Sequence, residues 1–190
     1  MPKLRIGCPL QGDFSDAAWH SMTIFDPRRL AWSIGIGGIL AGSFALAWYR
    51  FDAGSLPFGS PSFLEIFSFV AVLVILHEAS HLLGFPNTGF DSNTVIGIWP
   101  KIASPYVQYV SPMARNQFLL VLLLPVLTLS ILPFLLVASG IGSVGHLSWF
   151  SVLNCIGAGS DIVIYGKVLS VVPPNTSVME SDGKLYWAPQ

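Results

Sequence analysis

Four long apolar stretches alternate with short polar segments along the chain. They span approximately residues 30–49, 63–85, 118–139 and 147–171. Each is close to the ~20 residues that a helix needs to cross the ~30 Å hydrocarbon core of a bilayer. The pattern therefore predicts an all-α integral membrane protein with four transmembrane helices.

The third and fourth stretches differ in polarity. The third has no ionisable residue and contains Pro125 and Pro133, which are expected to kink it. The fourth is the least obvious, because it contains Asn154, Asp161 and Lys167. Charged side chains are costly in lipid, so their presence there indicates a functional role.

The segment that joins the second and third stretches is not a span. Pro86 ends the preceding helix, and two short runs rich in β-branched and aromatic residues follow, Thr94–Trp99 and Tyr106–Val110. We expect a short β-hairpin or re-entrant element, whose edge could hold an extended peptide by strand addition. An ordinary interfacial loop is the alternative. Asp182-Gly183 is a turn signal that predicts a second small hairpin in the C-terminal tail.

Composition agrees with a membrane location. Hydrophobic residues make up 53% of the 190 residues and charged residues only 10%, whereas soluble domains have roughly 25% charged residues. The net charge of -1 gives no indication of nucleic-acid binding. The two cysteines, Cys8 and Cys155, lie in very different surroundings and are too few for a disulfide framework or a thiol-based zinc site.

The basic residues orient the four helices. Of the 9 Lys and Arg residues, all except Arg50 fall near the two termini or in the 86–116 loop. The positive-inside rule then places both termini and this loop in the cytoplasm. We therefore expect a multi-pass protein, in a prokaryotic plasma membrane, with a cytoplasmic segment 1–29, a four-span membrane domain 30–171 and a cytoplasmic tail 172–190.

The second stretch contains His77-Glu78-Ala79-Ser80-His81, which reads H-E-x-x-H. Histidines four residues apart share one helix face, about 5–6 Å apart at Cβ, so both can bind one ion. Glu78 projects from an adjacent position, where a carboxylate can take a proton from an activated water. The spacing predicts a zinc hydrolase site with His77 and His81 as ligands and Glu78 as general base. The alternative is that these side chains only form interhelical hydrogen bonds.

Asp161 is the expected third ligand. In the predicted topology the second and fourth helices run in the same direction, and His77 and Asp161 each lie about 14 residues along their helix, at the same depth. Gly159 and Ser160 beside it would let helices approach closely. Asp91, in the loop just after the motif, is the alternative ligand.

Asn154 shares a helix face with Gly157 and Asp161, because they follow i, i+3, i+7 spacing. We expect Asn154 to hold a substrate backbone or to support the oxyanion, and an interhelical hydrogen bond is the alternative. His20 and His146 are interpreted as surface or interfacial residues.

These features together resemble a family of zincin-like membrane peptidases, a domain family of unknown function that is similar in layout to the site-2 intramembrane metalloproteases. The resemblance covers roughly residues 20–190. It rests on the histidine motif in the second span, the hairpin-like loop, the proline-containing third span and Asn154-x-x-Gly157-x-Gly159-Ser160-Asp161 in the fourth. It implies zinc held by His77, His81 and Asp161, with Glu78 as general base.

The chain departs from the site-2 pattern at two positions. Site-2 proteases usually have Gly after the metal-binding Asp, whereas Ile162 follows Asp161 here, and they often have Gly before the second His, where this chain has Ser80.

The sequence therefore predicts a zinc-dependent intramembrane peptidase in which a metal-activated water attacks a peptide bond of a membrane-protein or peptide substrate. The alternative is a non-proteolytic metal-binding membrane protein, either a carrier or an assembly module. A carrier would need further polar residues in the first and third stretches to continue a conduction path, and these stretches contain no charged residue or histidine.

Overall fold

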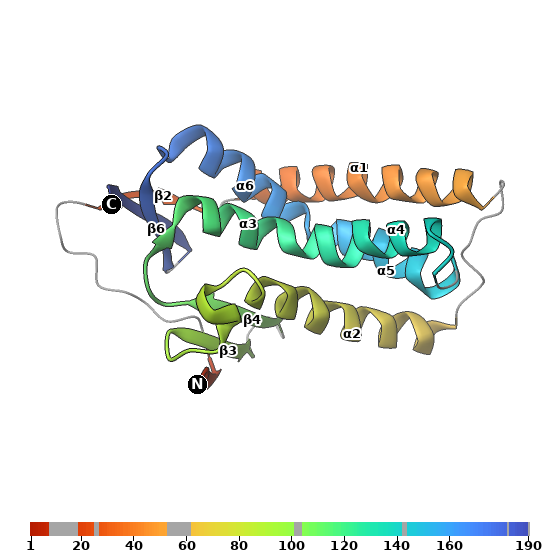
Figure 1. Ribbon diagram of the computed structural model, residues 1–190, viewed down its shortest axis with the longest axis horizontal. Helices are drawn as coiled ribbons and strands as arrows, with labels where there is room; N and C mark the ends of the chain where they lie inside the picture. The colour runs from red at the N-terminus through yellow and green to blue at the C-terminus, as the bar shows by residue number, and fades with distance from the viewer. Residues whose placement is uncertain are drawn as a thin grey trace.

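Long helices and two small β-sheets make up the computed structural model, which describes residues 1–7, 19–24, 27–52, 62–100, 104–141, 144–181 and 183–189. The long helices lie side by side along the longest axis of the molecule, and the strands gather toward one end, where both termini also lie (Figure 1). The molecule is therefore divided into an apolar helical part and a β-rich end.

Three helical segments are long and apolar enough to cross a membrane: Leu30–Phe51, Phe63–Leu82 and Arg115–Ala138. The first belongs to α1 (Pro27–Phe51) and the second is α2 (Phe63–Leu82). The third combines α3 (Arg115–Val126), a π-helical turn η2 (Leu127–Ile131) and α4 (Leu132–Ala138). Large apolar side chains lie exposed along these helices, as expected for surfaces that face lipid.

The fourth apolar stretch is a bent pair of helices. Here α5 (Val144–Gly157) and α6 (Gly159–Val171) meet at Ala158 with a bend of 49°. The described part of the chain thus has three candidate spans, or four if the bent pair crosses as one broken span. The bend lies next to a close contact with α1, because a Cβ on Gly159 would overlap the Ser33 carbonyl oxygen and lie 2.8 Å from the Gly37 nitrogen. Only glycine allows α6 to begin this close to α1.

The first sheet has three strands in the order β1-β3-β4. The central strand β3 (Thr94–Trp99) pairs in parallel with β1 (Lys3–Ile6) and antiparallel with β4 (Ser104–Tyr109). Strand β4 is therefore an edge strand, and one row of its backbone groups points away from the sheet.

The second sheet has four strands in the order β2-β7-β6-β5. It combines β2 (His20–Thr23), β7 (Lys184–Pro189), β6 (Thr176–Ser181) and β5 (Met113–Ala114) in antiparallel pairs. Strands β6 and β7 form the predicted C-terminal hairpin, with Gly183 at a positive φ of 68° in its turn; Asp182 lies outside the described residues. This sheet joins the N-terminal segment to the C-terminal tail.

The sequence-based prediction of an all-α protein with a hairpin-like cytoplasmic loop is wrong. Two sheets with seven strands are present in the described residues, and the runs near residues 94–110 belong to a three-stranded sheet. The reason is physical: β1 and β2 have four residues each, too short to show a periodic pattern, and find their partners about 90 and 160 residues away along the chain.

The main hydrophobic core lies where the second sheet packs against α3 and α6. Buried side chains from strands, loops and helices meet there: Met22, Ile24, Phe85, Tyr109, Met113, Phe118, Leu119, Val121, Leu122, Val168, Val172, Val178 and Leu185. This core fixes the sheet on the ends of the helices that carry the polar residues described below.

The α1–α6 contact can be tested with two alanine substitutions in one helix. Gly159→Ala should lower the free energy of unfolding by about 1–3 kcal/mol, because its Cβ would force two backbones apart. Gly166→Ala is the matched control: it has no atom within 4 Å of the new Cβ and should be neutral or stabilise α6 by up to ~1 kcal/mol. Unfolding in one detergent measures both, and equal effects would contradict the close contact.

Candidate metal centre

The side chains of His77, His81 and Asp161 meet between α2 and the first turn of α6. His77 Nε2 lies 3.2 Å and His81 Nε2 3.8 Å from Asp161 Oδ2. One possible ligand atom from each residue lies within 4.8 Å of the other two. The structure thus brings together the three residues that the sequence predicts as metal ligands.

The Nδ1 atom of each imidazole, on the side away from Asp161, already has a hydrogen-bond partner. His81 Nδ1 lies 2.9 Å from the Val121 carbonyl oxygen, and His77 Nδ1 lies 3.0 Å from Asn154 Oδ1. Both oxygens can only accept, so each Nδ1 donates its proton. A neutral imidazole has one N–H, and both Nε2 atoms therefore direct lone pairs toward Asp161.

Proline makes the Val121 oxygen available. A helical carbonyl normally accepts from the N–H four residues later, but that position is Pro125, which has no N–H. The Val121 oxygen can therefore accept from His81 without competition from its own helix. The proline that the sequence marks as a kink thus also provides a partner for a motif histidine.

The Asn154 amide is held by a buried polar network on its other side. Its Nδ2 donates to the Pro125 carbonyl oxygen at 2.8 Å and to Ser130 Oγ at 2.9 Å, which turns Oδ1 toward His77. Ser130 and Ser151 each donate their hydroxyl to the other's carbonyl oxygen, at 2.9 and 2.8 Å. The π-helical turn at Leu127–Ile131 carries Ser130 and so belongs to the support of His77.

This placement favours one of the two interpretations of Asn154. Asn154 is 1% exposed, its amide is fully engaged, and it is not among the described residues that line the neighbouring pocket. The geometry supports an interhelical hydrogen bond that positions His77, rather than contact with a substrate or oxyanion.

The three facing atoms suit a cation. Asp161 Oδ2 is buried and has no hydrogen-bond partner among the described residues, and the two imidazole nitrogens that face it present lone pairs. Ligand atoms about 2.0–2.2 Å from a tetrahedral zinc ion lie about 3.3–3.6 Å apart, a range that the distances of 3.2 and 3.8 Å bracket. The donor set of two imidazoles and one carboxylate therefore fits zinc.

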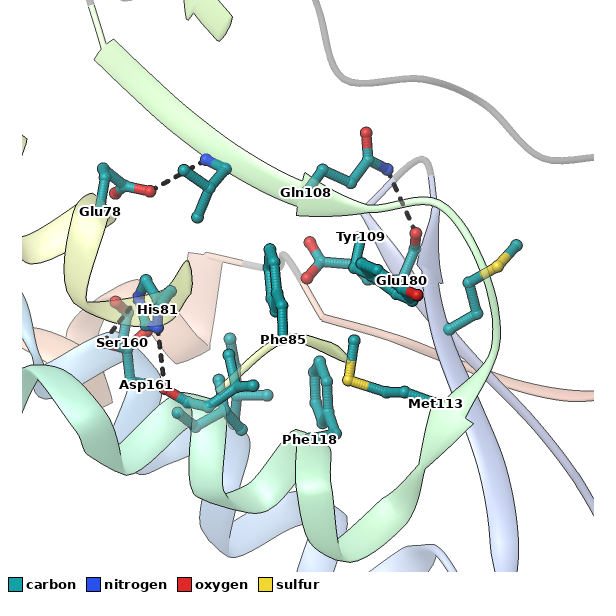
Figure 2. Close-up of a pocket in the computed structure, with 15 residues that line it drawn as sticks. Glu78, His81, Phe85, Gln108, Tyr109, Met113, Phe118, Ser160, Asp161 and Glu180 are labelled. Carbon is teal, nitrogen blue, oxygen red and sulfur yellow. Dashed lines mark hydrogen bonds and ion pairs between the residues drawn. The ribbon is translucent and has the colours of Figure 1, made fainter. Parts of the chain in front are cut away.

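Glu78 lies on the strand side of the motif helix. Its Oε2 accepts a hydrogen bond from the Val107 backbone N–H of β4 at 3.1 Å. Figure 2 draws this bond as the dashed line that begins at Glu78. Glu78, His81 and Asp161 all line a pocket of about 210 Å³ between β4, β6 and the helices. The predicted general base and two of the predicted ligands thus share one cavity.

The other candidate ligands lie elsewhere. Asp91 accepts hydrogen bonds from the backbone N–H groups of Asn93 and Thr94 and from the Tyr109 hydroxyl, so it stabilises the turn before β3. His20 stacks on Trp187 with ring centroids 5.7 Å apart. The side chain of His146 lies outside the described residues. The structure therefore gives no support to Asp91 as the third ligand.

Sequence reasoning missed three participants in this region: Val121, Ser130 and Glu180. Glu180 lines the pocket from β6. The chain has only three Glu residues, and Glu180 follows the β-branched Thr176 and Val178 at alternate positions, a spacing that could have placed it on the same face of a strand. The carbonyl of Val121 could have been found from Pro125, four residues later.

The H-E-x-x-H helix and a third ligand from another helix together form a metal site of the zincin type. The chain matches the model of a family described as Putative zincin peptidase over residues 70–176, more than half of its length and including all three candidate ligands. The chain therefore belongs to this family, which implies zinc and peptidase chemistry but does not point to the site-2 proteases in particular. No curated protein and no solved structure matches the chain.

Because Asn154 positions His77, its substitution should change the affinity for zinc and not the affinity for substrate. Asn154→Ala should weaken zinc binding by about 10–100-fold, because His77 loses the acceptor that fixes its tautomer. Asn116→Ala, at an exposed asparagine, should leave zinc affinity unchanged. Competition with a chromogenic chelator measures both. A raised KM with unaltered zinc affinity would instead show that Asn154 contacts the substrate.

Proposed function

We propose that the chain is a zinc-dependent peptidase that cleaves membrane-protein or peptide substrates beside its membrane helices. The observation that carries this proposal is the convergence of three candidate ligand atoms, from His77, His81 and Asp161, next to the Glu78 carboxylate. Membership of the zincin family supports the same chemistry.

The roles of the side chains follow from their placement. His77 and His81 would hold the ion through Nε2, and Asp161 through Oδ2. A bound zinc ion supplies Lewis-acid activation of a water and of the scissile carbonyl. Glu78 takes the proton of the attacking water on Oε1, since Oε2 is held by Val107, and then passes it to the leaving amine.

The outer edge of β4, where no further strand pairs in the described residues, favours an extended substrate. The Val110 N–H bonds to the carbonyl of Asn93, the residue just before β3. Along an antiparallel strand, residues whose backbone groups point toward the partner strand alternate with residues whose groups point away. The backbone groups of Val107 and Tyr109 therefore face away from β3. The Glu78 contact with the Val107 N–H agrees with this direction. A peptide that adds to this edge would run past Glu78, and strand addition is a common way to hold an extended chain.

The helices that carry the site support a membrane setting. The motif lies near the C-terminal end of α2, a candidate span, and Asp161 lies near the start of α6 in the bent pair. We propose an intramembrane peptidase with chemistry like that of site-2 proteases, in a prokaryotic plasma membrane, with 30–171 as the membrane domain. The basic residues favour placing the β-rich end and both termini in the cytoplasm.

Glu78→Gln is the sharpest test of the proposed reaction. This variant should keep stoichiometric zinc yet lose peptide hydrolysis by at least about 100-fold, because the ligands remain and the base is gone. His77→Ala should lose the metal itself. Zinc content by elemental analysis and cleavage of a labelled peptide library measure the two properties.

Glu65→Gln is the matched control for this experiment, because it makes the same change at the other end of α2 and glutamine can keep the capping box with Ser62. It should retain both zinc and activity. A wild-type protein that binds zinc but hydrolyses no peptide would favour a non-proteolytic metal-binding membrane protein. An active Glu78→Gln variant would remove the proposed base.

The proposed orientation has its own test. A fluorescent protein fused after Gln190 should fluoresce in bacterial cells, and alkaline phosphatase fused there should be inactive, because the C-terminal tail is placed in the cytoplasm. The same pair fused after Arg50 should give the opposite result. Active phosphatase at the C-terminus would overturn the orientation.

A further inference from the structure

A third carboxylate faces the proposed catalytic residues across the pocket. Glu180 lies on β6, and Figure 2 shows its side chain reaching from that strand into the space between β4 and the helices. Its backbone carbonyl accepts a hydrogen bond from Gln108 Nε2 at 3.3 Å, which ties β6 to β4 and fixes the position from which the side chain projects.

The Glu180 carboxyl is left without a partner by the residues that the structure describes. It makes no hydrogen bond or ion pair with any residue that the structure describes. Burial, with smaller contributions from the negative charges of Asp161 and Glu78, raises the pKa of Glu180 to about 7. A carboxyl in this setting lacks the positive charge that would favour its ionised form.

The pocket supplies no such charge. Its described lining includes three carboxyl groups, from Glu78, Asp161 and Glu180, and no Lys or Arg. A divalent ion held by the candidate ligands would offset the charges of Asp161 and Glu78 only. One negative charge, that of Glu180, would then remain for a group from outside the protein.

The walls around Glu180 suit a long side chain with a charged end. They are mainly apolar and aromatic, and include Phe85, Met113, Phe118, Leu122 and Ile164. Such walls can cover the methylene stem of a lysine or arginine side chain while its charged end meets a carboxylate. The volume of about 210 Å³ makes this a compact space rather than an open groove.

We propose that Glu180 forms a subsite for a cationic group of the peptide substrate, either a Lys or Arg side chain next to the scissile bond or the N-terminal amine. This inference rests on the proposed peptidase function and names its substrate class. The ammonium or guanidinium group meets the Glu180 carboxylate, and the apolar walls hold the rest of the side chain. A substrate with an acidic side chain at this position is disfavoured, because it would face Glu180 without a counter-charge.

Binding to the zinc-loaded, full-length Glu78→Gln protein in detergent tests the subsite without turnover. The probe is an alanine heptapeptide, blocked at both ends, with a central lysine; its uncharged counterpart has norleucine in place of lysine. The lysine peptide should bind about tenfold tighter or more, the range expected for one charge-assisted hydrogen bond. Adding Glu180→Gln should abolish this preference.

Three further arms give the test its controls. Glu180→Asp keeps the charge and should retain part of the lysine preference, whereas adding Glu65→Gln, outside the pocket, should leave the preference unchanged. The norleucine peptide with a free N-terminus identifies the N-terminal amine as the source of the cation, if this peptide alone shows the Glu180-dependent gain.

The outcomes separate this inference from the proposed function. Equal binding of all the peptides, or a lysine preference that persists in Glu180→Gln, overturns the subsite even if the wild type cleaves peptides. A Glu180-dependent preference in a protein that cleaves no peptide supports the subsite and overturns the peptidase. A Glu180-dependent preference together with faster cleavage of the cationic peptide by the wild type supports both.

Discussion

The candidate metal centre depends on where two imidazole protons are placed. Each histidine has one N–H in its neutral form, and each donates it away from the centre, to the Val121 carbonyl or to Asn154. Only this arrangement directs lone pairs from His77, His81 and Asp161 toward one point without placing an N–H group there. The partners come from α3 and α5, so the packing of three helices determines the chemistry of a five-residue motif on α2.

Irregular features of the helices supply these partners and the third ligand. Pro125 leaves the Val121 carbonyl without a helical donor, and the π-helical turn that follows carries the Ser130 hydroxyl that holds Asn154. The bend at Ala158 directs the start of α6, with Asp161 in its first turn, toward the motif, and Gly159 permits this approach beside α1. Departures from regular helix geometry are common at functional sites because they free backbone groups for other uses.

The sequence predicts those features whose pattern lies in neighbouring residues, and misses those that depend on segments far apart in the chain. Local patterns identified the apolar helices, the H-E-x-x-H motif and Asp161, since hydrophobic runs and helical spacing are written in consecutive residues. Strands β1 and β2 could not be found in this way, because a four-residue segment forms a strand only by pairing with a partner that lies far away in the chain. Glu180 was missed for the same reason: its place in the pocket depends on the pairing of β6 within a sheet that the sequence did not predict.

Under the proposed function, the junction between helices and sheets would address a difficulty of peptide hydrolysis within a membrane. The reaction needs water, an extended peptide and a polar site, none of which the hydrocarbon core provides. Here the motif lies near the end of α2, its Glu78 carboxylate contacts the edge of β4, and β6 contributes Met179 and Glu180 to the lining of the pocket. A helix that unwinds at this end would exchange its own backbone hydrogen bonds for those of a strand edge, so the sheet offsets part of the cost of exposing a peptide bond. The strands are therefore as much a part of the proposed catalytic apparatus as the helices that carry the ligands.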